Sequence, residues 1–290
     1  FSELQGSVST GATQRLQYDT NRVIGDTEAL RLNIMVQNGE AADRDRVTDD
    51  RLGLTVDYGR GLGTGTQWHL GYSYLRNRGV PDMGQPMGEA ADGRLRPLLE
   101  FDVPGYDRDI SYVRSTDRDD ADVHMVTSSL THDLDGGWSL SNDTRVTRYE
   151  RDFSATNPAL CDAACVAGLR AGIDQPLRYG AAGGMTYDQQ GWGVQNVTTL
   201  KGEAVTGGIR HQVTAGLDLS WQIDHRRRGA WLVARPEGTI LDPVFDARDA
   251  VFAWDDRDST AKALNAGLFL ADRMHFGEQV SVLASARADW

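Results

Sequence analysis

The chain has 290 residues, enough for one large β domain or two smaller ones, and its formal net charge of −12 gives a pI near 4.9. An acidic protein repels the phosphates of nucleic acids, so no nucleic-acid partner is expected. No apolar run approaches the roughly eighteen residues of a membrane helix and the N-terminus lacks a signal-peptide pattern, although a membrane-spanning β-strand needs only about ten alternating residues.

Apolar and polar side chains alternate along the first part of the chain. Strands are predicted near Ser2 to Ser9 and Arg15 to Val23, and a clearer one at Leu30 to Gln37. The segment Arg51 to Pro86 holds two more alternating runs, separated by the glycine-rich stretch Arg60 to Gly65. Glycine tolerates the positive φ of a tight turn, so this segment is predicted to be an antiparallel hairpin.

Further alternating segments follow in the second half of the chain. They are Val123 to Leu134, Trp138 to Tyr149, Trp192 to Leu200, His211 to Asp224, Leu264 to Asp272 and Val280 to Ala286. Together with the earlier segments they predict an all-β, antiparallel, up-and-down fold of about eleven strands.

The predicted connections alternate in length. Short ones contain glycine or lie beside it, whereas long ones fall at about Asn38 to Asp50, Asn77 to Asp120, Ser154 to Gln190 and Arg226 to Ser259. In a meander, alternate connections emerge at the same end, so one end has tight turns and the other has large polar loops. This asymmetry is typical of an outer-membrane β-barrel, although a lectin or a propeller could share it in part.

The aromatic residues favour the same interpretation. Several lie close to the short turns, and others, including Tyr149 and Phe153, lie near the long loops, as two interfacial belts would require. Strands are rich in aromatic residues in any case. The polar faces, with residues such as Arg31, Asp57 and Arg145, would line a wet lumen in a barrel or meet solvent in a sandwich.

Several motifs occur in a series that resembles a known family. They are RLNIMVQ at Arg31 to Gln37, RDRV at Arg44 to Val47, RLGL at Arg51 to Leu54, GLGTGT at Gly61 to Thr66, VPDMGQP at Val80 to Pro86 and TGGIRHQVTAGLDLS at Thr206 to Ser220. Their order and spacing are similar to those of TonB-dependent siderophore receptors, in the catecholate-receptor branch. The resemblance implies a transporter in the bacterial outer membrane that takes up a ferric siderophore without chemical change, not an enzyme.

The resemblance also implies parts that lie elsewhere in such receptors. The family has a plug domain, with a TonB-contacting segment, ahead of a barrel of 22 strands. Residues 1–290 are therefore expected to be part of one barrel domain, without the plug and without the later strands, and about eleven strands should not close into a cylinder. The expected partners are a ferric siderophore, outer-membrane lipid and, through the plug, TonB.

A ferric catecholate is a compact anion with aromatic rings, so cationic and aromatic side chains in the long loops are the expected ligand contacts. The candidates are Arg78, Asp82, Arg94, Arg96, Tyr106, Arg108, Tyr112, Arg114, Arg118, Arg226, Arg227, Arg228, Trp231 and Arg235. Alternatively, the loop arginines pair with the abundant neighbouring aspartates and only keep the loops solvated.

Cys161 and Cys165 lie in the third long loop, where an oxidising setting favours a disulfide over a zinc site, because no further ligands stand nearby. No cofactor, metal site or catalytic constellation is predicted. Two alternatives to siderophore uptake stay open. One is TonB-dependent uptake of another cargo, such as a hydroxamate, cobalamin, haem or a sugar, and the other is a soluble or surface β-protein that binds carbohydrate.

Overall fold

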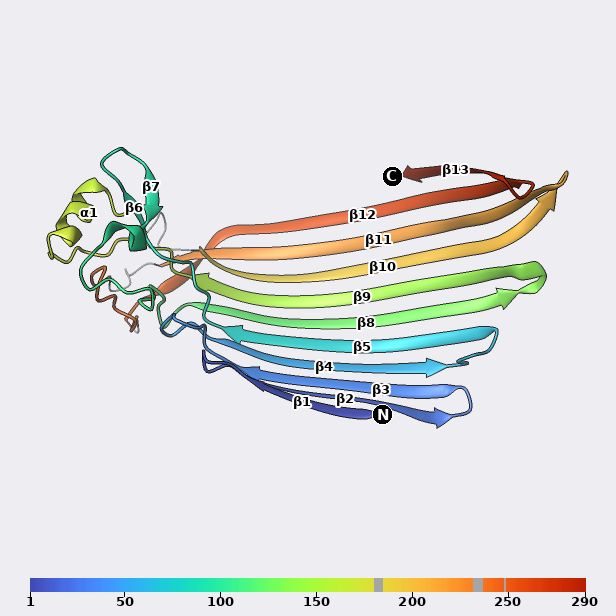
Figure 1. The fold of residues 1–290 in the computed structure, drawn as a ribbon, viewed down its shortest axis with the longest axis horizontal. Coiled ribbons are helices and arrows are strands. Elements are labelled where there is room, and N and C mark those ends of the chain that lie inside the picture. The colour runs from blue at the N-terminus through green and yellow to red at the C-terminus, as the bar shows by residue number, and fades with distance from the viewer. Residues whose placement is uncertain (180–184, 232–236, 248) are drawn as a thin grey trace.

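The computed structural model describes residues 1–179, 185–231, 237–247 and 249–290. In these ranges the chain forms an antiparallel sheet of eleven strands in the order β1-β2-β3-β4-β5-β8-β9-β10-β11-β12-β13 (Figure 1). The strands are β1 (Ser2–Val8), β2 (Gln14–Gly25), β3 (Glu28–Asn38), β4 (Asp49–Arg60), β5 (Thr66–Gly79), β8 (Arg118–Leu134), β9 (Trp138–Ala155), β10 (Met185–Thr206), β11 (Ile209–Trp231), β12 (Phe252–Phe276) and β13 (Val280–Asp289). The prediction of about eleven antiparallel strands in a partial barrel is confirmed.

The later strands are longer than the sequence predicts. Strands β10, β11 and β12 contain 22, 23 and 25 residues, whereas about ten residues are enough to cross a bilayer. The alternation of apolar residues marks only the middle of each strand. Polar residues such as Asp188 and Arg227 continue the same ladder beyond that middle part.

The two faces of the sheet differ in polarity. Val56, Tyr72, Val126 and Val146 lie opposite one another on four neighbouring strands and belong to the apolar face. Much of this face is exposed, with Leu264 at 72%. Exposed apolar surface of this extent marks a face that interacts with a membrane or with other protein.

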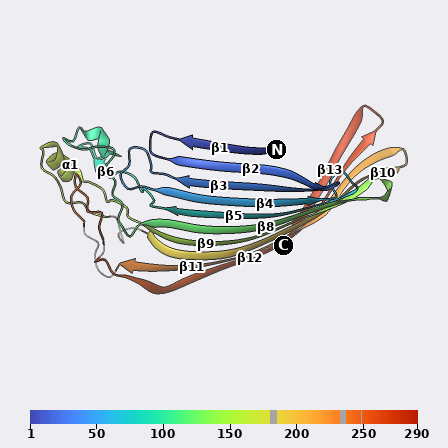
Figure 2. The same cartoon turned by 90° about the horizontal axis from the view of Figure 1, so that it is seen from below.

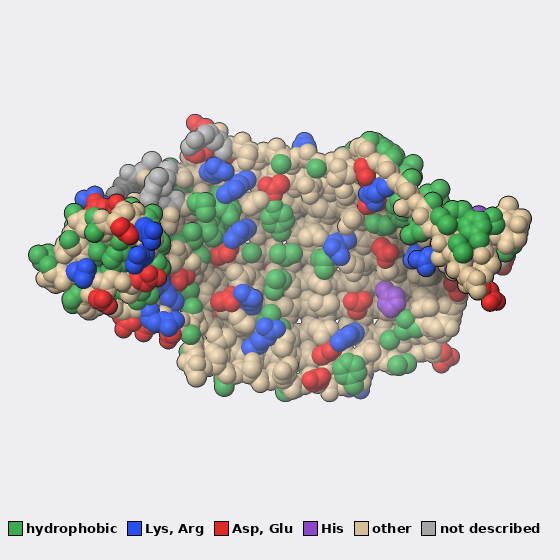
Figure 3. Space-filling view, turned by 45° about the horizontal axis from the view of Figure 1, so that its top comes forward, with side chains coloured by type: hydrophobic (Ala, Val, Ile, Leu, Met, Phe, Trp, Pro, Cys, Tyr) green, Lys and Arg blue, Asp and Glu red, His purple; other side chains and the backbone are tan. Residues whose placement is uncertain are grey.

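The polar face carries many small and hydrophilic side chains, and Figure 3 shows charges of both signs scattered over the sheet between uncharged side chains and backbone. A hollow of about 490 Å³ lies over neighbouring strands from β1 to β8, lined by residues of this face such as Gln17, Asn33 and Ser73. Such a hollow forms where a sheet curves toward one side, so the polar face is the concave one. Tyr149 and Phe153 belong to the polar face, because side chains alternate along β9 and these two lie on the same side as Arg145. They therefore do not belong to an aromatic belt on the apolar face.

Short turns lie at one end of the sheet and long loops at the other (Figure 1). The turn after β4 begins at Gly61, with φ of 71°, where a Cβ atom would lie 2.0 Å from the carbonyl oxygen of Thr66. Only glycine can occupy that position. One connection at the loop end, between β1 and β2, is short. Strands β1 and β13 form the edges of the open sheet, and no helix in the described ranges is long and apolar enough to cross a membrane.

Most of the best-buried apolar residues lie in the loops. Residues 80–117, 156–179 and 237–247 pack together into what we call the loop cap, which Figure 2 shows at one end of the curved sheet. The loop cap contains the short strands β6 (Met87–Glu89) and β7 (Leu95–Pro97), the 3₁₀ helix η1 (Leu98–Phe101) and the α-helix α1 (Ala163–Arg170). A second 3₁₀ helix, η2 (Asp135–Gly137), forms a turn at the opposite end of the sheet. The core of the loop cap is made of Leu98, Val103, Tyr112, Cys161, Val166, Leu169, Leu177 and Ile240. The long connections are therefore a packed unit.

Candidate functional site

Five of the arginines predicted to contact a ligand pair with aspartates. The pairs are Arg78 with Asp122 at 2.5 Å, Arg94 with Asp92 at 3.7 Å, Arg108 with Asp43 at 3.2 Å, Arg118 with Asp152 at 2.7 Å and Arg227 with Asp188 at 2.8 Å. The structure thus shows the alternative arrangement, in which neighbouring carboxylates offset the charge of these loop and strand-end arginines.

Three of these arginines also lie on the apolar face of the sheet. The strand register places Arg78, Arg118 and Arg227 on the same face as Tyr74 and Trp192. Their side chains therefore stand on the opposite side of the sheet from the hollow, near its loop end.

The other candidates are distributed over the loop cap and strand ends. Tyr106, Tyr112 and Arg114 belong to the interior of the cap, and the Arg114 guanidinium lies 4.4 Å from the centroid of the Tyr179 ring. Arg96 is exposed on β7, and Trp231 packs edge-on against Phe252. Arg235 lies outside the described residues.

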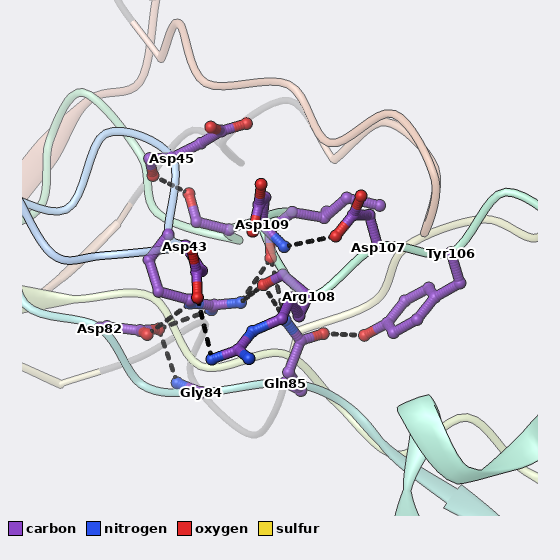
Figure 4. Close-up of polar contacts among 12 residues, drawn as sticks. Asp43, Asp45, Asp82, Gly84, Gln85, Tyr106, Asp107, Arg108 and Asp109 are labelled. Carbon is purple, nitrogen blue, oxygen red and sulfur yellow. Dashed lines mark hydrogen bonds and ion pairs between the residues drawn. The ribbon is translucent and has the colours of Figure 1, made fainter. Parts of the chain in front are cut away.

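Asp82 is held by Arg44, a residue of the loop between β3 and β4 (Figure 4). Arg44 Nε and Nη2 donate to the two carboxylate oxygens of Asp82 at 2.6 and 2.8 Å. Arg44 Nη1 donates to the carbonyl oxygens of Arg108 and Ile110 at 2.9 and 2.6 Å. Asp82 therefore serves to join two loops in this structure.

The electrostatics of this region follow from those contacts. Burial opposes the charge on Asp82, but hydrogen bonds from Arg44 and from the amide of Gly84 hold the pKa of Asp82 below its ordinary value. The reverse holds for Asp109, whose pKa is raised by loss of hydration and by repulsion from Asp107, Asp43 and Asp45. Burial raises the pKa of Tyr106 to about 12, so its hydroxyl stays protonated and donates to Gln85.

A second group of residues lies on the polar face, where the strands enter the loop cap. We call Asp119, Arg151, Phe153, Tyr187 and Arg226 the polar-face cluster. Arg151 donates to both carboxylate oxygens of Asp119 at 2.7 and 2.8 Å and to the Tyr187 hydroxyl at 3.0 Å. Phe153 and Tyr187 stack with their ring centroids 5.1 Å apart.

Arg226 completes this cluster from β11. Its guanidinium carbon lies 3.7 Å from the centroid of the Tyr187 ring. The Nε atom is buried and has no hydrogen-bond partner among the described residues, and no ion pair joins Arg226 to a carboxylate there. Arg151 pairs with Asp119, whereas Arg226 lies against the face of the Tyr187 ring and has no carboxylate partner among the described residues.

Sequence reasoning named Arg226 but missed Arg151 and Tyr187 as site residues. The signal is present in the sequence, because Arg151 and Phe153 continue the alternation that places Arg145 on the polar face. Tyr187 lies outside the predicted strand Trp192 to Leu200, so its face could not be assigned until the length of β10 was known.

The structure joins Cys161 and Cys165 by a disulfide, with the Cα atoms 5.3 Å apart. Cys161 is buried in the core of the loop cap, and Cys165 lies in the first turn of α1, where its amide donates to Asp162 at 2.9 Å. Over the part of the chain with described positions, no group of three or more His, Cys, Asp or Glu side chains could hold a metal ion.

Comparisons with known proteins place this geometry in context. The chain is 28% identical over 234 residues to the catecholate siderophore receptor Fiu of Escherichia coli strain K12, an alignment that covers 76% of this chain and 29% of Fiu. It is 29% identical over 260 residues to the probable TonB-dependent receptor BfrD of Bordetella pertussis, covering 89% of this chain and 33% of that protein. The chain thus spans about a third of the length of these relatives.

Solved structures show the same fold. The open form of the ferric-catecholate import receptor Fiu from E. coli K12 superposes with a TM-score of 0.80 at 21% identity, over 99% of this chain and 43% of that one. The siderophore receptor PiuA from Acinetobacter baumannii gives a TM-score of 0.69 at 18% identity, over 100% and 45%. The family described as TonB dependent receptor-like, beta-barrel, matches residues 53–290. This family consists of outer-membrane receptors and transporters rather than enzymes, and the chain belongs to it.

Proposed function

We infer that this chain is part of the barrel wall and the outer loops of a receptor for ferric siderophores, with the catecholate type as the preferred cargo. The family, and relatives whose names describe siderophore receptors, support the siderophore class. The polar-face cluster supports the catecholate type, because it combines cationic and aromatic groups.

The observation that carries this proposal is the environment of Arg226. A partly buried guanidinium with an unsatisfied Nε atom is stabilised by an anion, and a planar ring beside it favours ligands that stack. Ferric catecholates offer both properties, since the complex is anionic and its rings are flat. Neutral hydroxamate complexes offer neither to the same degree.

The rest of the transport cycle is proposed on the same basis. The apolar face of the sheet lies against outer-membrane lipid, and the concave polar face surrounds the path of the cargo. Energy reaches the receptor through TonB, which contacts the plug of such proteins. The residues of this chain bind and orient the cargo without changing it chemically.

Two neighbouring residues provide the test. Arg226 points to the polar face, whereas Arg227 points to the apolar face and pairs with Asp188. In the full-length parent protein in detergent, Arg226→Gln and Arg227→Gln are compared by tryptophan quenching with a ferric catecholate, a ferric hydroxamate and the iron-free compounds. Deleting residues 77–120 is a poorer test, because it removes Leu98 and Tyr112 from the core of the loop cap.

Arg226→Gln is expected to weaken catecholate binding about tenfold to a hundredfold, the range for loss of a charge-assisted contact. Arg227→Gln should bind like the parent. Equal effects of the two variants would contradict the role of Arg226. Absence of quenching by every ferric ligand, from a folded parent, would overturn the siderophore proposal and favour another cargo.

A further inference from the structure

Four consecutive residues of the loop between β3 and β4, which we call the clamp segment (residues 43–46), contact different parts of the loop cap. Asp43 pairs with Arg108, and the amide of Asp45 donates to the carbonyl oxygen of Asp109 at 2.9 Å. The guanidinium carbon of Arg46 lies 4.8 Å from the centroid of the Phe245 ring, and Phe245 belongs to the loop between β11 and β12. The clamp segment thus reaches two of the three cap loops.

Arg44 is the best-connected residue of this segment. Its side chain is only 13% exposed, and all three guanidinium nitrogens donate hydrogen bonds, to Asp82 and to the carbonyl oxygens of Arg108 and Ile110. Gln85 donates to the same two carbonyl oxygens at 3.1 Å each. Arg44 therefore fixes two turns of the 80–117 loop relative to each other and to the sheet.

The contacts continue from Arg44 toward residues 237–247 of the loop cap. Gln85 accepts from the Tyr106 hydroxyl, which lies 3.3 Å from the hydroxyl of Tyr112. Tyr112 in turn donates to the carbonyl oxygen of Ile240 at 3.0 Å. Polar contacts and the packing of Tyr106 beside Tyr112 therefore connect the clamp segment, through the 80–117 loop, to residues 237–247.

The backbone of the clamp segment is strained. Asp43 and Arg46 flank Arg44 and Asp45, and their φ angles are 55° and 62°. Residues other than glycine rarely adopt such positive φ angles. Such conformations persist where surrounding contacts over-determine them, and they concentrate at functional clamps and switches. Two of them within four residues indicate a segment shaped for its contacts.

We propose that Arg44 is a positioning residue that holds the loop cap in one arrangement over the polar-face cluster and so slows release of the bound cargo. The part of this inference that concerns cargo rests on the proposed function. The part that concerns the cap stands on the contacts alone. Arg44 acts on the cap and not on the cargo, because all three of its guanidinium nitrogens donate to protein groups.

The test uses the full-length parent and the variants Arg44→Ala, Arg44→Lys and Arg60→Gln. Arg60 is the control, because it is an exposed arginine at the turn end of the sheet whose ion pair with Glu28 joins two neighbouring strands and no loops of the cap. Hydrogen exchange is followed without ligand at the amide of Ser115, which donates to Phe245 across two loops at 2.9 Å. Association and dissociation rates of a ferric catecholate are measured in parallel.

In Arg44→Ala the Ser115 amide should exchange at least about tenfold faster, and the ligand should dissociate faster with little change in association, because loss of the clamp raises the population of open loops. Arg44→Lys should be intermediate, since an ammonium group can pair with Asp82 but cannot reach both carbonyl oxygens in a fork. Arg60→Gln should match the parent.

Unchanged exchange in Arg44→Ala, or full rescue by lysine of both exchange and dissociation, would overturn the proposal. Full rescue would mean that only the positive charge matters, as in a direct ligand contact. If the parent binds no ferric ligand, the proposed function fails, and the exchange measurements still decide whether Arg44 holds the cap.

Discussion

Tyr149 of β9 lies directly over Gly191 of β10, so close that a Cβ atom at residue 191 would be 2.5 Å from the Tyr149 ring. The tyrosine hydroxyl donates to Asp224, and Gln189 donates to both the tyrosine oxygen and Asp224, at 2.9 and 2.8 Å. The missing side chain at Gly191 thus makes room for a ring that links three neighbouring strands just below the polar-face cluster.

Replacing Gly191 by alanine is expected to destabilise the protein by about 1–3 kcal/mol, because the tyrosine ring must move and its hydrogen bonds weaken. Gly193→Ala is the matched control. It lies on the same strand and the same face, and a Cβ atom there would meet nothing within 4 Å. Urea unfolding of the full-length parent in detergent measures both. Equal midpoints for the two variants would contradict the packing role of Gly191.

This pair shows what periodicity can and cannot predict. The alternation in β9 and β10 predicts both strands, and its parity places Tyr149 with Arg145 on the polar face. Proximity to the long loops suggested instead that Tyr149 belongs to an aromatic belt, and the alternation of side chains along β9 shows that this suggestion is wrong. The register that brings Gly191 under Tyr149 depends on strand pairing, which a single sequence does not specify.

Asp82 should make the loop cap sensitive to acid. Its pKa is lowered in the folded protein, so its contribution to stability is fully present above the ordinary aspartate pKa of about 3.9 and is lost as the pH falls through the lowered folded pKa. Asp109 acts in the opposite direction. Its pKa is raised, so its unfavourable repulsion fades as the pH falls.

The corresponding experiment compares the parent with Asp82→Asn. Exchange protection of the 80–117 loop, corrected for intrinsic rates, should fall in the parent below about pH 4. In Asp82→Asn it should already be reduced at pH 7, by about 1–3 kcal/mol of local opening free energy, because the charge-assisted bonds from Arg44 are lost. A parent whose loop protection is unchanged between pH 7 and pH 3 would show that the Arg44–Asp82 pair contributes nothing to the cap.

The disulfide should act locally. Cys161 is fixed to β6 by two backbone hydrogen bonds, its amide donating to Met87 and its carbonyl oxygen accepting from Glu89, each at 2.9 Å. The disulfide connects this fixed point to α1. The variant with both cysteines changed to serine should expose α1, so that trypsin cuts after Arg170 faster, while the unfolding midpoint of the sheet changes little because the closed loop is short. A large shift of the sheet's midpoint would contradict this.

The loop cap is the part of the fold that the sequence did not reveal. Its core residues, from Leu98 to Ile240, are spread over irregular segments with no repeating period, so nothing in the sequence pattern brings them together. Candidate ligand residues were therefore chosen by side-chain type and loop position. By that criterion a core tyrosine such as Tyr112 cannot be distinguished from an exposed one, nor an arginine paired with aspartate from one that is not.

Tyr112 provides the last test, because the same residue would behave differently as a core residue and as a ligand contact. Its hydroxyl donates to the buried carbonyl oxygen of Ile240, and burial raises its pKa far above the ordinary value. Tyr112→Phe should cost about 1–2 kcal/mol in the opening of the cap, because the Ile240 carbonyl loses its donor while the ring still fills the core. Catecholate affinity should fall only by the amount that the cap loosens. Tyr72→Phe removes a hydroxyl that contacts His124 on the apolar face and serves as the control. A loss of affinity in Tyr112→Phe with unchanged exchange protection of the cap would show instead that the tyrosine contacts the ligand.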